Sequence, residues 1–189
     1  MTSARGFSLL ELLVAALAGT LVLAGLFSLY LATARSLGES NARIVLQRQG
    51  ALAIEEIGRQ VRGAVGPGAI SLVTCNGTAN SVQVVTPAGA VCYYAGSDGA
   101  LCEFRGTRCR NLLGGGLKTI VLLTQPALPD PRCPSGIPAG APCLSVTPNA
   151  TYPTSQVDVA FAIRDSAGDV DGLDAMSFAI SLTCRGRNC

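Results

Sequence analysis

The feature that most constrains this chain is an uncharged apolar segment near its start. From Leu12 to Ala34, 23 consecutive residues carry no charged side chain. A helix of that length, at ~1.5 Å per residue, extends about 35 Å and can cross a bilayer with some tilt. The run is also longer than the apolar part of a secretory signal peptide. The sequence therefore predicts a transmembrane helix followed by a soluble part.

The helical pattern continues beyond the apolar segment. Small and apolar residues recur three or four positions apart with charged residues between them, which is typical of an amphipathic helix. Gly66-Pro67-Gly68 then gives a strong stop signal. We predict one helix over residues 7–65, with residues 7–34 as its membrane half and residues 35–65 as an amphipathic half that packs on the chain's own domain. The predicted packing stripe is Ala42, Leu46, Gly50, Ala53, Ile57, Val61 and Ala64.

Residues 69–189 are predicted to form a globular β-rich domain, which makes the fold class α+β. Eight prolines between Pro126 and Pro153 argue against an internal strand there, so this segment is interpreted as a long surface loop pinned by Cys133 and Cys143. Elsewhere, short apolar or alternating runs separated by turn residues predict a meandering antiparallel sheet. These runs are Ala69–Thr74, Ser81–Thr86, Ala90–Tyr94, Ala100–Arg105, Leu117–Thr124, Gln156–Arg164 and Ala175–Thr183.

All eight cysteines lie beyond the apolar segment. An even number there is typical of disulfide bonds in an oxidising compartment, which places the domain outside the cytoplasm. Metal binding is the alternative, and it is disfavoured because the chain has no histidine and no Cys-x-x-Cys pair. Eight cysteines allow 105 connectivities. Our hypothesis is that neighbours in the sequence pair, as Cys75–Cys92, Cys102–Cys109, Cys133–Cys143 and Cys184–Cys189.

The residues before the apolar segment are unusual. A short leader, Met1–Gly6, precedes Phe7, and Glu11 places a carboxylate at the start of the apolar helix. An ionisable residue at that depth is costly and points to a function. The alternative is a surface glutamate favourably placed near a helix N-terminus. That alternative accounts for Glu11 but not for the Gly6-Phe7 junction.

The string Gly6-Phe7-Ser8-Leu9-Leu10-Glu11 resembles the prepilin processing and methylation motif of type IV pilins and type II secretion pseudopilins. The resemblance implies that residues 1–6 are removed by a membrane prepilin peptidase, which cuts after Gly6 and methylates the new amine of Phe7. It also implies that Glu11 meets this amine during assembly and sets the axial register of a filament. Residues 7–34 would then form part of the filament core.

Residues 46–64 look like the second helical half of PilW-like minor pilins. The eight cysteines, and Ser28 where many major pilins have a kinking proline, also favour a minor pilin or pseudopilin over the bulk subunit. The resemblance therefore implies a pilin-like fold and a structural subunit that primes assembly of a type IV pilus or sits at its tip.

The same resemblance implies where the protein resides and what it contacts. The precursor would be a single-pass inner-membrane protein with a periplasmic C-terminal domain, and the assembled subunit would lie in the pilus, or fimbrium, at the cell surface. The implied partners are the prepilin peptidase, major and minor pilins, the inner-membrane assembly platform and the lipid bilayer. The alternatives are a minor pseudopilin of a type II secretion system, an adhesin or DNA receptor carried on a pilin stem, and a plain anchored periplasmic protein.

No enzyme and no cofactor are predicted. The absence of histidine excludes Ser-His-Asp and Cys-His catalysis, and the sequence has no Walker loop and no dinucleotide fingerprint. A net charge of +2 is too small to argue for nucleic acid. A basic DNA-binding patch lacks interleaved aromatic residues, so nucleic acid is not expected as a partner. The arginines considered for such a patch are Arg105, Arg108, Arg110, Arg185 and Arg187.

Four aspartates lie close together between the last two predicted strands, at Asp165, Asp169, Asp171 and Asp174. Oxygen ligands at this spacing could hold Ca²⁺, although the segment does not fit an EF-hand loop, which needs a glutamate at its twelfth position. A solvated Asp/Gly hairpin turn is the preferred interpretation. We therefore predict no metal site.

Overall fold

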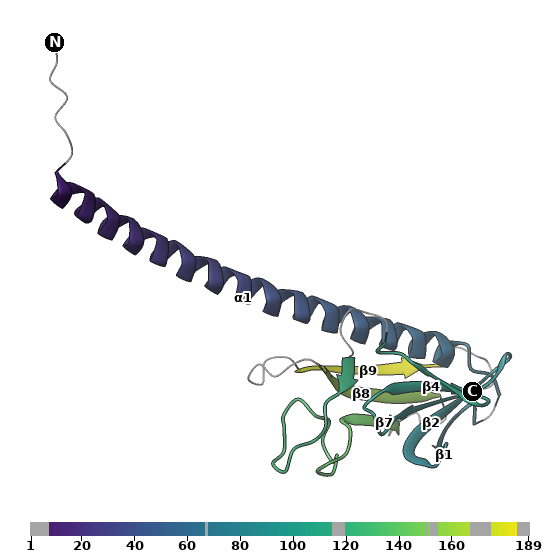
Figure 1. Ribbon diagram of the computed structural model, residues 1–189. Coiled ribbons are helices and arrows are strands. Elements are labelled where there is room, and N and C mark those ends of the chain that lie inside the picture. The colour runs from purple at the N-terminus through teal and green to yellow at the C-terminus, as the bar shows by residue number, and fades with distance from the viewer. Residues whose placement is uncertain are drawn as a thin grey trace. The chain divides into compact units, whose positions relative to one another are not determined.

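The computed structural model describes residues 8–66, 68–114, 120–149, 151, 155–166 and 175–184. In this part of the chain, one long helix is followed by antiparallel strands, which confirms the predicted α+β class (Figure 1). The chain divides into two units, Met1–Asn41 and Ala42–Cys189, and the boundary falls inside the helix. The elements are α1 (Leu9–Arg62), β1 (Ile70–Cys75), β2 (Thr78–Thr86), β3 (Gly89–Ala95), β4 (Leu101–Arg105), β5 (Arg108–Asn111), β6 (Ile120–Leu122), β7 (Leu144–Pro148), β8 (Gln156–Asp165) and β9 (Ala175–Thr183).

The part of α1 in the second unit packs as predicted. Its buried residues are Ala42, Leu46, Gly50, Ala53, Ile57, Gly58 and Val61, so the predicted stripe is confirmed as far as Val61, with Gly58 added. Ala64, the last residue of the predicted stripe, is buried but lies beyond the end of the helix. The helix ends at Arg62, three residues earlier than predicted. There the Gly63 N–H donates to the carbonyls of Arg59 and Gln60, and Gly66 follows with a φ of 94° that favours glycine.

The first sheet is a meander in the order β1-β2-β3-β4-β5, with every pair antiparallel. Side chains alternate between its faces, so Val84 and Tyr93 point into the main core while Tyr94 and Phe104 form a smaller cluster on the opposite face. Strand β5 was not predicted, because its four residues show no apolar alternation. It forms because the two residues between Arg105 and Arg108 make a tight turn that returns the chain along β4.

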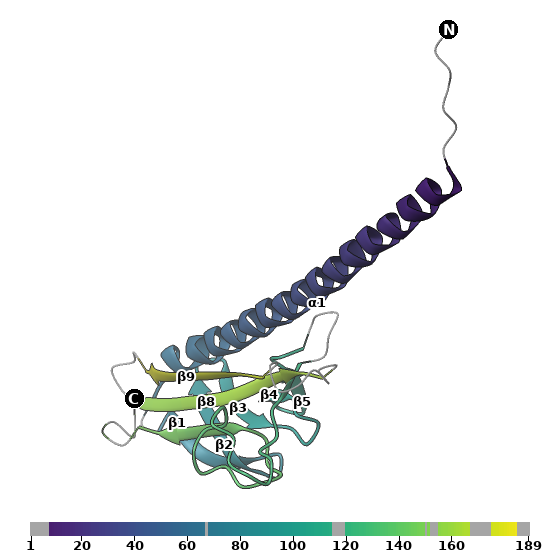
Figure 2. The same cartoon turned by 90° about the vertical axis from the view of Figure 1, so that its left-hand side faces the viewer.

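The second sheet is centred on β8, which pairs with β9 along nearly its whole length (Figure 2). On its other edge β8 pairs with β6 and β7. Our prediction of a single meandering sheet is therefore wrong. The predicted loop over residues 126–153 is also wrong in part, because β7 lies within it. Leu144 and Val146 alternate with exposed or half-buried polar residues, and the strand ends at Pro148, a position where a missing N–H is tolerated.

One main hydrophobic core joins the second half of α1 to both sheets. Strand β9 runs beneath this part of the helix in Figures 1 and 2. The Phe178 ring stacks on Phe161, with centroids 5.3 Å apart, and fills the space above Gly50. A Cβ atom at Gly50 would lie only 2.2 Å from Cζ of Phe178. A glycine in a helix interior costs about 1 kcal/mol of stability relative to alanine. Gly50 is nevertheless needed here, because the Phe178 ring lies where a Cβ atom would be.

Candidate functional sites

The N-terminal end of α1 carries a capping box. The Glu11 N–H donates to Oγ of Ser8 over 3.2 Å, and the Ser8 N–H donates to Oε2 of Glu11 over 3.3 Å. These two bonds satisfy backbone donors that have no partner within the helix. The Ser-x-x-Glu spacing of Ser8 and Glu11 in the sequence is the one that a capping box requires. The predicted cleavage and methylation residues, Gly6 and Phe7, lie outside the described residues.

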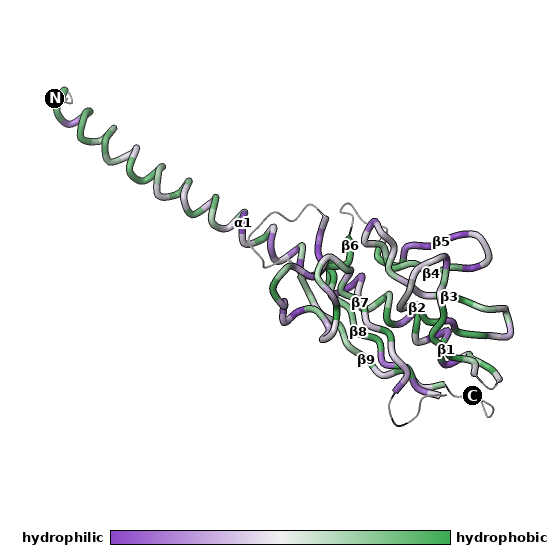
Figure 3. Tube along the Cα trace, turned by 90° about the horizontal axis from the view of Figure 1, so that it is seen from below, coloured by the Kyte–Doolittle hydropathy of each residue, from purple (hydrophilic) through white to green (hydrophobic). Residues whose placement is uncertain are grey.

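The described part of the first unit, residues 8–41, exposes its side chains on all sides of the helix. The residues along the first half of α1 are mainly hydrophobic (Figure 3), and the exposure of the large ones ranges from 41% at Leu31 to 80% at Leu9. Within α1, the most apolar stretch is long and apolar enough to cross a membrane. Such a surface needs lipid or other apolar helices around it, because water solvates it poorly.

The serine and threonine hydroxyl groups in this apolar half are paired within the helix. Thr20 and Ser28 donate to the carbonyls of Leu17 and Gly25 over 2.9 and 2.8 Å, and Thr33 donates to the Leu29 carbonyl over 2.8 Å. Each of these aliphatic hydroxyls thus has an acceptor on its own helix. Their pairing suits a hydrocarbon environment, where an unpaired polar group is costly.

Three disulfide bonds join Cys75 to Cys92, Cys102 to Cys109 and Cys133 to Cys143, in agreement with the predicted pairs. Cys184 is also disulfide-bonded. Its predicted partner, Cys189, lies outside the residues that the structure describes. The bridges tie β1 to β3, β4 to β5, and the proline-rich segment to the start of β7.

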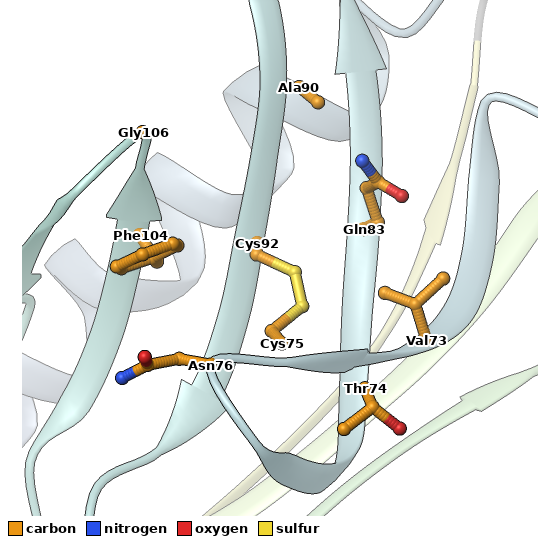
Figure 4. A pocket seen from close by; sticks show the side chains of 9 residues that line it. All are labelled: Val73, Thr74, Cys75, Asn76, Gln83, Ala90, Cys92, Phe104 and Gly106. Atoms are coloured by element: carbon orange, nitrogen blue, oxygen red, sulfur yellow. A yellow bond between two sulfur atoms is a disulfide. The ribbon is translucent and has the colours of Figure 1, made fainter.

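The Cys75–Cys92 bridge borders a shallow hollow of about 320 Å³ on the face of the first sheet opposite the main core (Figure 4). Phe104 and Val73 flank the disulfide, and Gln83 supplies an amide. Outside the disulfide, none of the described residues that line this hollow has a titratable side chain. Its lining therefore offers packing and hydrogen bonding but no acid–base chemistry.

A second hollow lies between the second half of α1 and the β4–β5 hairpin, and all the described residues that line it are charged. We call it the arginine hollow, and its volume is about 380 Å³. Glu103, only 2% exposed, accepts from Arg105 Nε over 2.6 Å and from Arg110. Arg110 also reaches Glu56 over 3.0 Å, so it joins the helix to the hairpin. The residues lining the arginine hollow are Glu56, Arg59, Glu103, Arg105, Arg108 and Arg110.

On the helical side of the arginine hollow, the neighbours of Glu56 keep its carboxyl group ionised. Partial burial acts to raise the pKa of Glu56, but hydrogen bonds from Arg59 and Gln60 and the charges of Arg59 and Arg110 together lower the pKa below its ordinary value. Arg59 donates to Glu56 over 2.6 Å. The pKa of Arg110 is raised, chiefly by its hydrogen bond to Glu103. The Glu56–Arg59 ion pair therefore persists at neutral pH.

Of the five arginines considered for a DNA patch, the structure brings Arg105, Arg108 and Arg110 together and adds Arg59. Arg185 and Arg187 fall outside the described ranges. The sequence pattern did not reveal Arg59 or the two glutamates, because they reach the hollow only through the packing of α1 on the sheet.

The predicted aspartate cluster is described only at Asp165, which is buried at the end of β8. Asp169, Asp171 and Asp174 belong to the part of the chain that the structure does not describe. Among the described residues, no three Asp, Glu, Cys or His side chains lie close enough to hold a metal ion.

Comparison of the chain with protein-family models, with curated proteins and with solved structures found no match.

Proposed function

We propose that the protein is a minor subunit of a type IV pilus, which acts in priming the filament or at its tip. The observation that carries this proposal is the apolar half of α1, which exposes hydrophobic side chains all round and begins at a paired Ser8 and Glu11. A helix that is apolar on all sides belongs in a membrane or inside an assembly of helices. Type IV pilins, whose processing motif the N-terminal string resembles, use both environments in turn.

The two halves of α1 are suited to different roles, one in packing on the domain and one in contacting lipid or other helices. Residues 42–61 bury a stripe against the sheets and hold the helix on the domain. Residues 9–41 bury no side chain within the described part of the chain, so their surface is available to lipid before assembly and to neighbouring helices after it. Gly19 and Gly25 are open, because a Cβ atom added at either position would meet nothing within 4 Å, and such small residues would let a second helix approach closely.

Two features favour a minor subunit over the bulk subunit. The disulfides distribute covalent links through the whole domain instead of closing one C-terminal loop. Ser28 stands where many major pilins have a proline, and α1 is an uninterrupted helix through this position. An uninterrupted first half is expected to pack differently from a kinked one.

In this account Glu11 has two successive roles. Before cleavage its carboxylate caps the helix with Ser8. After cleavage the amine of Phe7 becomes a nearby cation, and a carboxylate in apolar surroundings is stabilised by such a partner. The pairing between Glu11 and a neighbouring subunit's Phe7 amine would set the axial register of the filament.

The two roles can be separated by two substitutions. Glu11→Gln keeps a side-chain acceptor for the Ser8 N–H, because glutamine also completes a capping box, but it removes the charge. Ser8→Ala removes the cap, at about 0.5–2 kcal/mol of helix stability, and keeps the charge. We expect both variants to be cleaved. We expect the amount of Glu11→Gln protein recovered in sheared filaments to fall about tenfold or more, as for loss of a charge-assisted hydrogen bond. Ser8→Ala should be incorporated at a level close to that of the wild type.

The reverse pattern, with Glu11→Gln incorporated and Ser8→Ala excluded, would mean that Glu11 serves only as a cap and would remove the assembly role. Recovery of the wild-type protein with a type II secretion apparatus, and never with pilus fibres, would assign it to the pseudopilins, which share the same N-terminal features.

A further inference from the structure

The arginine hollow carries more positive than negative charge, and this excess is not used by the fold. We propose that the arginine hollow is a docking site for an acidic side chain of a partner protein, whose carboxylate is bound by Arg108 and the free N–H groups of its neighbours. This inference does not depend on the proposed pilus function, because it rests only on residues of the second unit.

The charges do not balance within the hollow. Its lining among the described residues consists of four arginines and two glutamates, which gives these residues a net charge of +2. Arg105 and Arg110 pair with Glu103, and Arg59 pairs with Glu56. Among the described residues Arg108 makes no ion pair and no side-chain hydrogen bond. Its guanidinium is exposed beside the two ion-paired glutamates.

The ion-paired arginines also have N–H donors that the described ion pairs do not use. A guanidinium has five N–H donors, and Arg105 uses only its Nε toward Glu103. The side chains of Arg105 and Arg110 remain 44% and 60% exposed, so both guanidinium-bearing side chains are accessible from solvent. A carboxylate that enters the hollow can therefore receive two parallel bonds from one guanidinium, the geometry that arginine favours.

The backbone around these donors is fixed before any ligand arrives. Arg105 and Arg108 flank a two-residue turn, and Phe104 is paired with Cys109 across the hairpin. The Cys102–Cys109 bridge closes the same hairpin, and the contact of Arg110 with Glu56 joins it to α1. A site whose framework is already ordered loses less entropy on binding.

The hollow suits a carboxylate better than a nucleic acid. None of the described residues that line it is aromatic, and single-stranded nucleic acids are normally held by stacking on aromatic rings. Glu56 and Glu103 would repel a continuous row of phosphates, whereas a single carboxylate can sit beside Arg108 and avoid them. A volume of about 380 Å³ accommodates a side-chain group. The chemistry therefore favours an acidic peptide segment.

The test uses the full-length protein in non-ionic detergent and isothermal titration calorimetry. The probe is an acetylated and amidated Glu-Gly-Glu-Gly-Glu peptide, and its control is the same peptide with glutamine in place of glutamate. We expect the acidic peptide to bind, the glutamine peptide not to bind, and Arg108→Gln to weaken binding by about tenfold, as for loss of one charge-assisted hydrogen bond.

Arg164→Gln is the matched control variant, since it removes one exposed arginine from β8, away from the arginine hollow. It should change the dissociation constant by less than about twofold, because an exposed charge outside the site contributes little. Because Arg108 has no side-chain partner among the described residues, Arg108→Gln should keep the wild-type melting temperature.

Three results would overturn the proposal. The first is no binding of the acidic peptide to the wild type. The second is an equal loss of affinity in Arg108→Gln and Arg164→Gln, which would show general charge attraction. The third is tighter binding of a single-stranded oligonucleotide that is lost in Arg108→Gln, which would make the ligand a nucleic acid.

Discussion

Two adjacent tyrosines in β3 differ in whether their hydroxyl groups find a partner. The Tyr93 hydroxyl is buried and makes no hydrogen bond among the described residues. Burial, with the negative charges of Glu103 and Glu56, raises its pKa, so it stays neutral. The Tyr94 hydroxyl accepts from Nδ2 of Asn76 over 3.0 Å. An unpaired buried hydroxyl costs stability, whereas a paired one contributes to it.

We therefore predict opposite effects for the two phenylalanine variants. Tyr93→Phe should raise the free energy of unfolding by about 1 kcal/mol, and Tyr94→Phe should lower it by about 1 kcal/mol. Denaturant unfolding of the full-length protein, followed by near-ultraviolet circular dichroism, measures both. Equal destabilisation by the two variants would show that the Tyr93 hydroxyl has a partner after all.

Gly50 and Gly58 are two buried glycines of α1 that meet different neighbours. A Cβ at Gly50 would overlap the Phe178 ring, which is stacked on Phe161. A Cβ at Gly58 would instead lie 3.0 Å from the flexible end of Arg62 and 3.3 Å from a terminal methyl group of Leu182, so only small side-chain shifts are needed. We predict that Gly50→Ala lowers stability by about 1–2 kcal/mol, since overpacking outweighs the gain in helix propensity. Gly58→Ala should be nearly neutral. Thermal unfolding of both variants checks the contrast, and a stabilised Gly50→Ala would contradict the close approach of β9.

At the scale of elements, the proline-rich segment before β7 contains a local ion pair with a defined pH dependence. The side chain and backbone N–H of Arg132 donate to Asp130, which lowers the pKa of this carboxyl from 3.8 to about 2. A carboxyl whose folded pKa lies below its unfolded value stabilises the fold above the unfolded pKa. This contribution is full above about pH 4 and is lost as the pH falls toward 2.

Asp130→Asn should remove that acid-sensitive contribution. Between pH 5 and pH 2 we expect the free energy of unfolding to fall by about 1 kcal/mol more in the wild type than in the variant, after allowance for solvent screening of the ion pair. Melting temperatures across this range measure the difference. If the melting temperatures of the two proteins fell equally as the pH is lowered, the Asp130–Arg132 pair would not contribute to stability.

Elements whose pattern is set by local periodicity could be predicted, and elements set by their partners could not. The stripe of α1 was readable because helix packing repeats every three or four residues. Strand β5 has no such signal and depends on the hairpin turn and on β4. Strand β7 was hidden by the prolines around it, although Leu144 and Val146 already alternate in the sequence.

The same distinction holds for the candidate sites. Three disulfides were predictable because each joins cysteines close in the sequence. The capping role of Glu11 could also have been predicted, because Ser8 lies three residues before it. The apolar surroundings instead favoured an interpretation based on the charge of Glu11. The arginine hollow needed the three-dimensional structure, because Glu56 and Glu103 are 47 positions apart and meet only through Arg110.

At the scale of the whole molecule, an apolar helix surface and a disulfide-linked domain coexist in one chain. The exposed half of α1 is a surface that water solvates poorly, while the domain buries a core of its own. Such a chain is expected to be stable only where lipid or other helices cover residues 9–34. The proposed move from membrane to filament provides cover at both stages.

The most direct test of this account is the intact mass of the protein purified from its native membrane or filaments. We predict a chain that begins at Phe7 with one added methyl group and has lost residues 1–6. All eight cysteines should be oxidised in the same species. A chain that still begins at Met1, or one cut near Ala34 after the apolar segment, would contradict the proposed function.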